Sequence, residues 1–274
     1  AWVHLADIKP ETPFPEEVCI EYNLILKPES KNSGLAQQLP SICYPGRERP
    51  SFMVQPRVRR FYHGSCRKPH HDADDAFAAL DRETQSTLND ADSRTGFLML
   101  TGDQIYADDV AGPMLHAIHR TIELLGLYDE EFDQAAVGST AGLYKKGLYT
   151  RKKILPRTRV GNRWYRRGGI KHIFSSSFAE NHMISFAEWM AMYILVWSPT
   201  LWPHIDINKI SLPDEHQEKW HREKAILQKF VEQIPHAARI FAHTPTYMIF
   251  DDHDITDEWN LTARWEEKAY GHPF

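Results

Sequence analysis

The chain has 274 residues, a net charge of -5 and 42% hydrophobic residues, values that are ordinary for a globular protein with a substantial core. The negative net charge excludes a strong overall attraction to nucleic acid or to an anionic membrane. The most apolar helical stretch, 177–197, contains Glu180 and Glu188, and these charges argue against a membrane span.

Cysteine usage and the start of the chain bear on its compartment. Cys19, Cys43 and Cys66 are an odd number at irregular spacing, which is a poor disulfide framework, although one pair could form in an exported protein. The start shows no signal peptide, so we expect a cytoplasmic protein. The chain begins with Ala1 rather than Met, however, and export remains the alternative if the true N-terminus is missing.

Proline and polar turn residues dominate the first part of the chain, residues 1–56. We predict one or two strands, with a strand-like run at 18–26, followed by a long connector. The remainder, 57–274, is predicted to be one large domain that carries a basic insertion at 144–171.

Strand and helix patterns alternate after residue 57. A short strand is predicted at 58–63, a helix at 72–88 and a buried strand at 97–101. Strand, helix and strand in this order are typical of a parallel sheet with helices packed on its faces. A further helix is expected at 113–125, with Pro113 in its first turn.

The most basic stretch, 144–171, has Tyr149, Trp164 and Tyr165 among its lysines and arginines. Interleaved aromatic and cationic side chains are typical of a patch that binds phosphate or nucleic acid. The plainer interpretation is a solvated loop or hairpin, and a cap that guides an anionic substrate lies between the two. Because the whole chain is acidic, we favour the hairpin and expect nucleic acid as a partner only if it is a substrate.

Two more helices and a strand complete the chain. We predict a helix at 177–197 and an amphipathic helix that begins at Asp214 and is stopped by Pro235, because proline cannot continue a helix. A strand at 247–250 follows. The complete pattern predicts an α/β fold.

Two of the predicted strands end with carboxylates directly after the apolar run. Asp103 follows the 97–101 strand, with Tyr106 three residues later, and Asp-Asp-His-Asp at 251–254 follows the 247–250 strand. Ligands of α/β proteins gather outside the carboxyl ends of strands. We therefore predict one metal site assembled between these ends, although a helix cap and an acidic turn would explain the same aspartates.

The strand at 58–63 ends in small residues that expose Cys66. A lone cysteine is more often a buried small hydrophobe than a ligand. Arg67 and Lys68 follow it in sequence and would favour its thiolate, the form that binds metal. Cys66 is thus a candidate ligand, and Arg67 is a candidate clamp for a phosphate group.

Three motifs together resemble the PhoD-like (alkaline phosphatase D) branch of the metallophosphoesterases. They are Gly-Ser-Cys-Arg-Lys-Pro at 64–69, Thr-Gly-Asp-Gln-Ile-Tyr-Ala-Asp at 101–108 and Phe-Asp-Asp-His-Asp at 250–254. The resemblance spans residues 59–260. It implies an α/β/β/α sandwich and an enzyme that hydrolyses phosphomonoesters or phosphodiesters at a two-metal site.

The resemblance also implies a role for each matching residue. Cys66 takes the first ligand position, Asp103 bridges two metals, and Tyr106 is the phenolate ligand of a ferric ion. Asp252 matches the ligand of the second metal, and His253 matches the histidine over the leaving group. The implied cofactors are Fe3+ and Ca2+, with other divalent ions as alternatives.

The chemistry of these residue types agrees with that set. A thiolate, a phenolate and a carboxylate suit trivalent iron, and a carboxylate-rich position suits a hard divalent ion. Two ions about 3.5–4 Å apart need a bridging ligand, and Asp103 has two oxygens. A metal-activated hydroxide would attack phosphorus in line with the leaving oxygen, which His253 is placed to protonate.

The chain departs from the family pattern near its end. The family completes the site with later histidine and aspartate ligands, in a Gly-Asp-x-His or Gly-His-x-His stretch, and no such stretch follows His253; residues 271–274 are only a superficial match. We therefore expect that C-terminal strands and several ligands are absent. On this expectation, the chain by itself binds metal poorly or is inactive.

Overall fold

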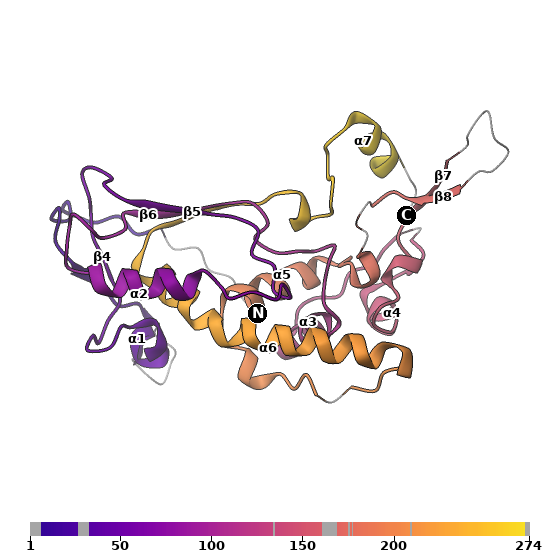
Figure 1. Ribbon diagram of the computed structural model, residues 1–274, viewed down its shortest axis with the longest axis horizontal. Coiled ribbons are helices and arrows are strands. Elements are labelled where there is room, and N and C mark those ends of the chain that lie inside the picture. Colours follow the sequence, from indigo (N-terminus) through magenta and orange to yellow (C-terminus); the bar gives the residue numbers. More distant parts are fainter. Residues whose placement is uncertain are drawn as a thin grey trace.

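A three-stranded parallel sheet organises the structure (Figure 1). The computed structural model describes residues 7–26, 33–133, 135–160, 169–174, 176, 178–208 and 210–271. The sheet has the order β5-β6-β9, and its strands are β5 (Phe61–Gly64), β6 (Phe97–Thr101) and β9 (Thr246–Ile249). The predicted α/β class is confirmed as a mixed α/β fold with a small parallel sheet.

The register of the sheet places the three strand ends at one edge. Gly64 pairs with Leu100, and Thr101 pairs with Ile249. Because all pairs are parallel, the loops that follow β5, β6 and β9 leave the sheet side by side. The three motifs singled out in the sequence begin at this edge.

One face of the sheet is covered by two helices, α2 (Phe77–Thr87) and α6 (Asp214–His243). Inward side chains of β6 meet them in a small apolar core of Leu98, Leu100, Phe77, Ala237 and Ile240. Figure 1 shows both helices on the same side of the strands.

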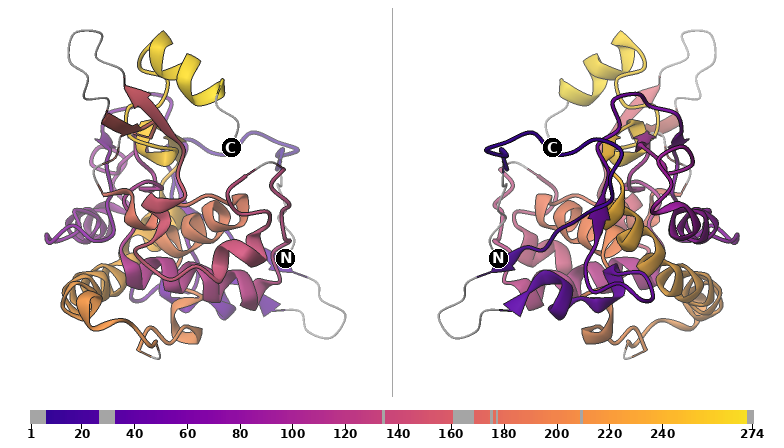
Figure 2. Two further views of the ribbon diagram at one scale, coloured as in Figure 1. Left: turned by 90° about the vertical axis from the view of Figure 1, so that its right-hand side faces the viewer. Right: turned by 90° about the vertical axis from the view of Figure 1, so that its left-hand side faces the viewer.

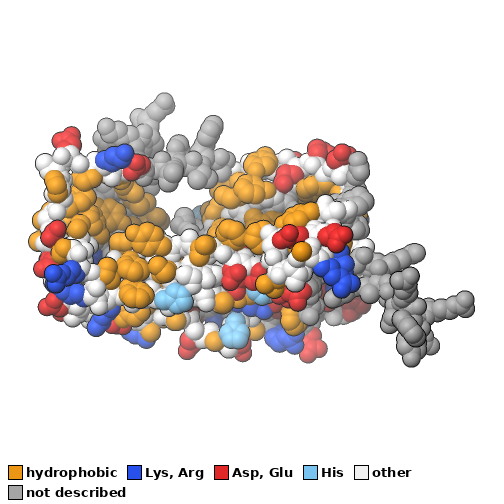
Figure 3. Space-filling model, turned by 90° about the horizontal axis from the view of Figure 1, so that it is seen from above, with side chains coloured by type: hydrophobic (Ala, Val, Ile, Leu, Met, Phe, Trp, Pro, Cys, Tyr) orange, Lys and Arg blue, Asp and Glu red, His pale blue; other side chains and the backbone are white. Residues whose placement is uncertain are grey.

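The opposite face of the sheet carries large apolar side chains that are exposed. Phe61 is 54% exposed, Tyr247 62% and Ile249 59%, and the ring of Phe61 stacks on that of Phe97. Figure 3 shows hydrophobic side chains on the surface seen from this side. Parallel sheets are ordinarily covered on both faces, so this face has the character of a packing surface.

The larger core lies among three helices, α3 (Gly112–Leu125), α5 (Phe186–Trp197) and α6. The predicted helix at 177–197 begins later than expected. Ser185 caps it, because its hydroxyl accepts the Glu188 N–H at 3.3 Å and Glu188 Oε2 accepts the Ser185 N–H at 3.1 Å. Figure 2 shows α7 (Ala263–Tyr270), in yellow, on the opposite side of the molecule from α6.

The prediction that the helix beginning at Asp214 stops at Pro235 is wrong. Helix α6 continues through Pro235 to His243, although proline lacks the N–H for an intrahelical bond and costs about 3 kcal/mol inside a helix. Ile234, Ala237 and Ile240 are all fully buried on either side of this proline. Their packing outweighs the local preference, so the helix does not stop where the sequence predicts.

The first part of the chain forms several short elements, and the predicted run at 18–26 is divided between two short strands. β1 pairs with β4, and β2 pairs with β3, both antiparallel. These elements are β1 (Ile20–Glu21), β2 (Ile25–Leu26), β3 (Ser33–Gly34), α1 (Leu35–Gln38), η1 (Pro40–Ile42) and β4 (Ser51–Phe52).

The basic stretch contains an antiparallel hairpin, β7 with β8. Residues 161–168 and the side chains at 158–160 and 169–172 lie outside the described part, and the predicted anion or nucleic-acid patch falls partly on them. Arg151 is fully buried and bonds Glu188 Oε1 at 2.7 Å, so this cation supports the fold. The remaining elements are α4 (Thr140–Tyr144), η2 (Arg151–Lys153), β7 (Arg157–Val160), β8 (Gly169–His172), η3 (Ala179–Asn181), η4 (Trp202–His204) and η5 (Asp252–Asp254).

Membrane spans and cysteine pairing can be checked directly. Within the described ranges, no helix has both the length and the apolar character needed to cross a bilayer. Cys19, Cys43 and Cys66 are all unpaired.

A buried polar cluster joins the N-terminal elements to α6. The Arg94 guanidinium donates to the carbonyl oxygens of Leu88 at 2.6 Å, Ser51 at 2.7 Å and His243 at 3.0 Å. The His243 ring completes it, because Nδ1 accepts the Ser51 N–H and Nε2 donates to the Ile42 carbonyl, both at 3.1 Å. A second proton on this ring would turn Nδ1 into a donor facing another donor.

This ring makes stability depend on pH. Burial is the main cause that lowers the pKa of His243 to about 4, and the charge of Arg94 lowers this pKa further. The hydrogen bond to Ile42 acts in the opposite direction and raises the pKa. The unfolded chain protonates this histidine near pH 6.5, so stability from the neutral ring is complete above about 6.5 and is lost as pH falls toward about 4. We expect a loss of about 3 kcal/mol, measured by denaturant unfolding. His243→Gln should remove this part of the pH dependence, and His221→Gln, on an exposed residue, should keep it.

Candidate metal centre

Three loops build the candidate site, one after each strand of the parallel sheet. Backbone hydrogen bonds hold them together: Cys66 N–H donates to the Gly102 carbonyl at 3.0 Å, and Ala107 N–H donates to the His253 carbonyl at 2.8 Å. The site therefore lies outside the carboxyl ends of the strands, where α/β folds bind ligands.

The buried carboxylate of Asp254 ties two of these loops to each other. It accepts the backbone N–H groups of Gln104 at 2.9 Å, Ile105 at 3.1 Å and Asp251 at 3.1 Å, and the Tyr193 hydroxyl at 2.5 Å. Burial raises the pKa of Asp254, against the lowering effect of these hydrogen bonds. Asp254 thus acts as a framework residue that positions its neighbours.

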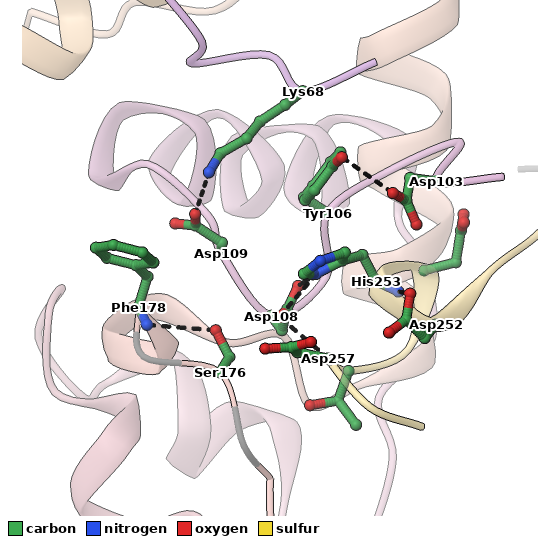
Figure 4. Close-up of polar contacts among 12 residues, drawn as sticks. Lys68, Asp103, Tyr106, Asp108, Asp109, Ser176, Phe178, Asp252, His253 and Asp257 are labelled. Carbon is green, nitrogen blue, oxygen red and sulfur yellow. Dashed lines mark hydrogen bonds and ion pairs between the residues drawn. The ribbon is translucent and has the colours of Figure 1, made fainter. Parts of the chain in front are cut away.

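Asp103 lies at the centre of the site. The Tyr106 hydroxyl donates to Oδ2 of Asp103 at 3.0 Å, and Figure 4 shows the two side chains together. Among the described residues, no group donates a hydrogen bond to the other oxygen, Oδ1, although it is buried. A buried carboxylate oxygen without a partner is costly, and a cation would satisfy it.

The charge of Asp103 raises the pKa of two neighbouring side chains, Tyr106 and Cys66. Burial raises the pKa of Tyr106, and the Asp103 carboxylate and Cys66 raise it further. For Cys66, contact with Ser65 lowers the pKa of the thiol, but burial and the charge of Asp103 outweigh that effect and raise it. Cys66, Asp103 and Tyr106 therefore form one electrostatically coupled group, and a bound cation would favour the ionised form of each.

Asp252 joins this group from the third loop. Ligand atoms of Asp103, Asp251 and Asp252 all lie within 4.8 Å of one another. The Asp252 carboxylate is held by the backbone N–H groups of His253 at 3.0 Å and Glu258 at 2.9 Å. The structure thus places three residues that the sequence predicts as ligands, Cys66, Tyr106 and Asp252, beside the fourth, Asp103.

His253 is oriented by a carboxylate that the sequence analysis did not single out. Nδ1 of His253 lies 2.9 Å and 3.0 Å from the two oxygens of Asp108, which is fully buried, and the ring packs on Tyr106 at 4.8 Å. Burial alone lowers the pKa of His253, but the hydrogen bond and charge of Asp108, with Asp103 and Asp252, outweigh it and raise the pKa. Asp257 lies on the same turn, and its ligand atom is within 4.8 Å of those of Asp252 and His253.

The backbone at the site has unusual conformations. Cys66 and Asp103 have φ of 61° and 41°, the left-handed region that favours glycine. Gly102 has φ of 144°, and a Cβ there would lie 3.0 Å from Asp251 Oδ2. Such strain at Cys66 and Asp103, two neighbouring non-glycine residues, is typical of a functional site.

Arg67 does not lie with the other predicted residues. Its guanidinium bonds the Asp75 carboxylate at 2.7 Å and the Val196 carbonyl at 2.6 Å, and packs on the rings of Trp197 and Phe230. Burial lowers the pKa of Arg67, and the charge of Asp75 opposes this. The guanidinium is committed to an ion pair and an aromatic cage, so its position does not support the predicted phosphate clamp.

Lys68 also has a carboxylate partner, Asp109 (Figure 4). The other oxygen of Asp109 lies 3.2 Å from the His70 ring. The expectation that Arg67 and Lys68 favour the Cys66 thiolate is wrong, because each cation is paired with its own carboxylate.

Comparisons with known proteins found no relative of this chain. No family model, curated protein or solved structure matches the chain. The interpretation of the site therefore depends on its geometry.

Proposed function

We propose that the chain is a metal-dependent phosphoesterase of the PhoD-like type, which hydrolyses phosphomonoesters or phosphodiesters. One observation carries the proposal. Asp103 presents a buried oxygen that accepts no hydrogen bond from the described residues, at the point where loops from three strands meet. Ligand-type side chains from two other positions, Cys66 and Asp252, lie beside it.

The donor set fits the proposed cofactors. Cys66 and Tyr106 beside Asp103 offer a thiolate and a phenolate, which suit Fe3+, and Asp252 offers the oxygen ligand that Ca2+ prefers. When bound, such cations would neutralise charge on phosphoryl oxygens and lower the pKa of a bound water.

The remaining roles belong to His253 and Asp108. Because Nδ1 of His253 is bonded to the buried Asp108, Nε2 is the nitrogen left to donate a proton to the leaving oxygen. Asp108 fixes the orientation of the ring, as carboxylates do for catalytic histidines. The proposal gives His253 the role of general acid and Asp108 that of a positioning residue.

The proposal also predicts a second β-sheet in the complete fold. A second sheet on the open face of β5-β6-β9, over Phe61, Tyr247 and Ile249, would complete an α/β/β/α sandwich. Burial of these three side chains would contribute roughly 1.5–3 kcal/mol each.

Hydrolysis of p-nitrophenyl phosphate and bis-p-nitrophenyl phosphate by the full-length protein, supplied with Fe3+ and Ca2+, tests this function. We expect turnover that a chelator abolishes and cations restore. We also expect a visible iron–tyrosinate absorption band that Tyr106→Phe removes and Tyr247→Phe, on the open face, retains. The absence of hydrolysis with every cation would contradict the proposal.

A further inference from the structure

We infer that Asp251 is a cation ligand, so that Asp103, Asp251 and Asp252 form a three-carboxylate site for a hard divalent cation of the Ca2+ class. The inference rests on the metal centre proposed above, but not on the reaction carried out there. Neither the motif resemblance nor the sequence pattern assigns a role to Asp251.

The position of the Asp251 side chain is set by its own loop. Asp251 is the residue before η5, and Oδ1 accepts the Asp252 N–H at 3.0 Å. This hydrogen bond orients the carboxylate and leaves Oδ2 over the backbone of Gly102, where a Cβ would lie 3.0 Å away. Only glycine at 102 lets this carboxylate approach Asp103 so closely.

An independent observation favours a positive partner among these carboxylates. Asp103 is 5% exposed, and its Oδ1 receives no hydrogen bond from any described group. Figure 4 shows the Asp103 carboxylate facing the loop that carries Asp252 and His253. Three carboxylates with ligand atoms within 4.8 Å repel one another. The two cations that follow Cys66, Arg67 and Lys68, do not offset this repulsion, because each is paired with another carboxylate.

The donor atoms indicate the class of cation. All three side chains supply carboxylate oxygens, which hard cations such as Ca2+ prefer, and no sulfur or imidazole belongs to this trio. The softer donors, Cys66 and Tyr106, also contact Asp103, and the Tyr106 hydroxyl bonds its Oδ2. Asp103 is thus the residue shared by the softer donors and the carboxylate trio.

The test measures cation binding directly. Ca2+ titration calorimetry and Tb3+ luminescence, with Tb3+ as the calcium probe, are applied to the full-length protein and to Asp251→Asn. Asparagine keeps the oxygen that accepts the Asp252 N–H, so the loop is retained while the charge is lost. We expect Ca2+ and Tb3+ affinity to fall roughly 10–100-fold, with the iron–tyrosinate band unchanged.

Two further variants provide a second test and a control. Gly102→Ala displaces the Asp251 carboxylate without changing a ligand, and should weaken Tb3+ binding in the same way. Glu258→Gln removes an exposed charge from the same loop and should leave affinity within about twofold. Unchanged Ca2+ affinity in Asp251→Asn, or a wild-type protein that binds neither Ca2+ nor Tb3+, would overturn the inference. Calcium binding through Asp251 without phosphoester hydrolysis would uphold it while refuting the proposed function.

Discussion

Replacing Asp103 with asparagine is expected to lower phosphoester hydrolysis roughly a thousandfold, a larger loss than the 10–100-fold typical for groups that only orient a ligand. Asparagine has the same shape but no negative charge, and it cannot offer two anionic oxygens to two cations. The Tyr106 hydroxyl would also lose its charged acceptor, now at 3.0 Å. Steady-state kinetics and metal analysis of the purified variant measure the two effects together.

Asp109→Asn is the matched control for this variant. Asp109 is a buried carboxylate on the same loop, but its partners are Lys68 and His70 rather than the metal-ligand group. We expect its activity to stay within tenfold of wild type, while Asp103→Asn loses both metal and activity. An Asp103→Asn protein that keeps full activity would show that the reaction does not use this carboxylate.

Replacing Asp254 with alanine is expected to destabilise the fold by about 3–5 kcal/mol. The substitution leaves the N–H groups of Gln104, Ile105 and Asp251 and the Tyr193 hydroxyl without their shared acceptor. Each buried donor that loses its partner costs about 1–3 kcal/mol, and partial hydration reduces the sum. Because the same bonds position two loops of the site, cation affinity should fall with stability.

Denaturant unfolding of Asp254→Ala, Asp254→Asn and Glu266→Ala separates the causes. Asparagine keeps one acceptor oxygen, so its loss should be smaller than that of alanine. Glu266 is an exposed carboxylate on α7, and its removal should change stability by no more than about 0.5 kcal/mol. If Asp254→Ala unfolds at the wild-type midpoint, the carboxylate does not hold the loops together.

The strands of the central sheet were predictable from local pattern. The apolar runs at 97–101 and 247–250 end in Gly-Asp and Asp-Asp sequences, and the structure places β6 and β9 there. Parallel pairing then brings their ends to one edge, so the convergence of Asp103 and Asp252 followed from motif order and strand direction.

The predictions for Pro235 and Arg67 failed because distant contacts decided them. Helix α6 continues beyond Pro235, a residue type that ends most helices, because Ala237 and Ile240 are buried against the sheet. Arg67 follows Cys66 directly, but Cys66 has a left-handed φ of 61°, so the chain turns there and adjacency in sequence does not fix where the next side chain lies. The thiol thus faces the site while the guanidinium enters the core between Asp75 and Trp197.

The run Asp-Asp-His-Asp at 251–254 shows what each level of information determined. By itself the sequence placed a carboxylate-rich turn at a strand end, because apolar runs and acidic residues are local features of the chain. Only the tertiary structure distinguished their roles: Asp251 and Asp252 face Asp103, His253 meets Asp108, and Asp254 is buried as a framework residue. Side-chain direction in an irregular turn depends on backbone angles and long-range hydrogen bonds, which residue spacing does not encode.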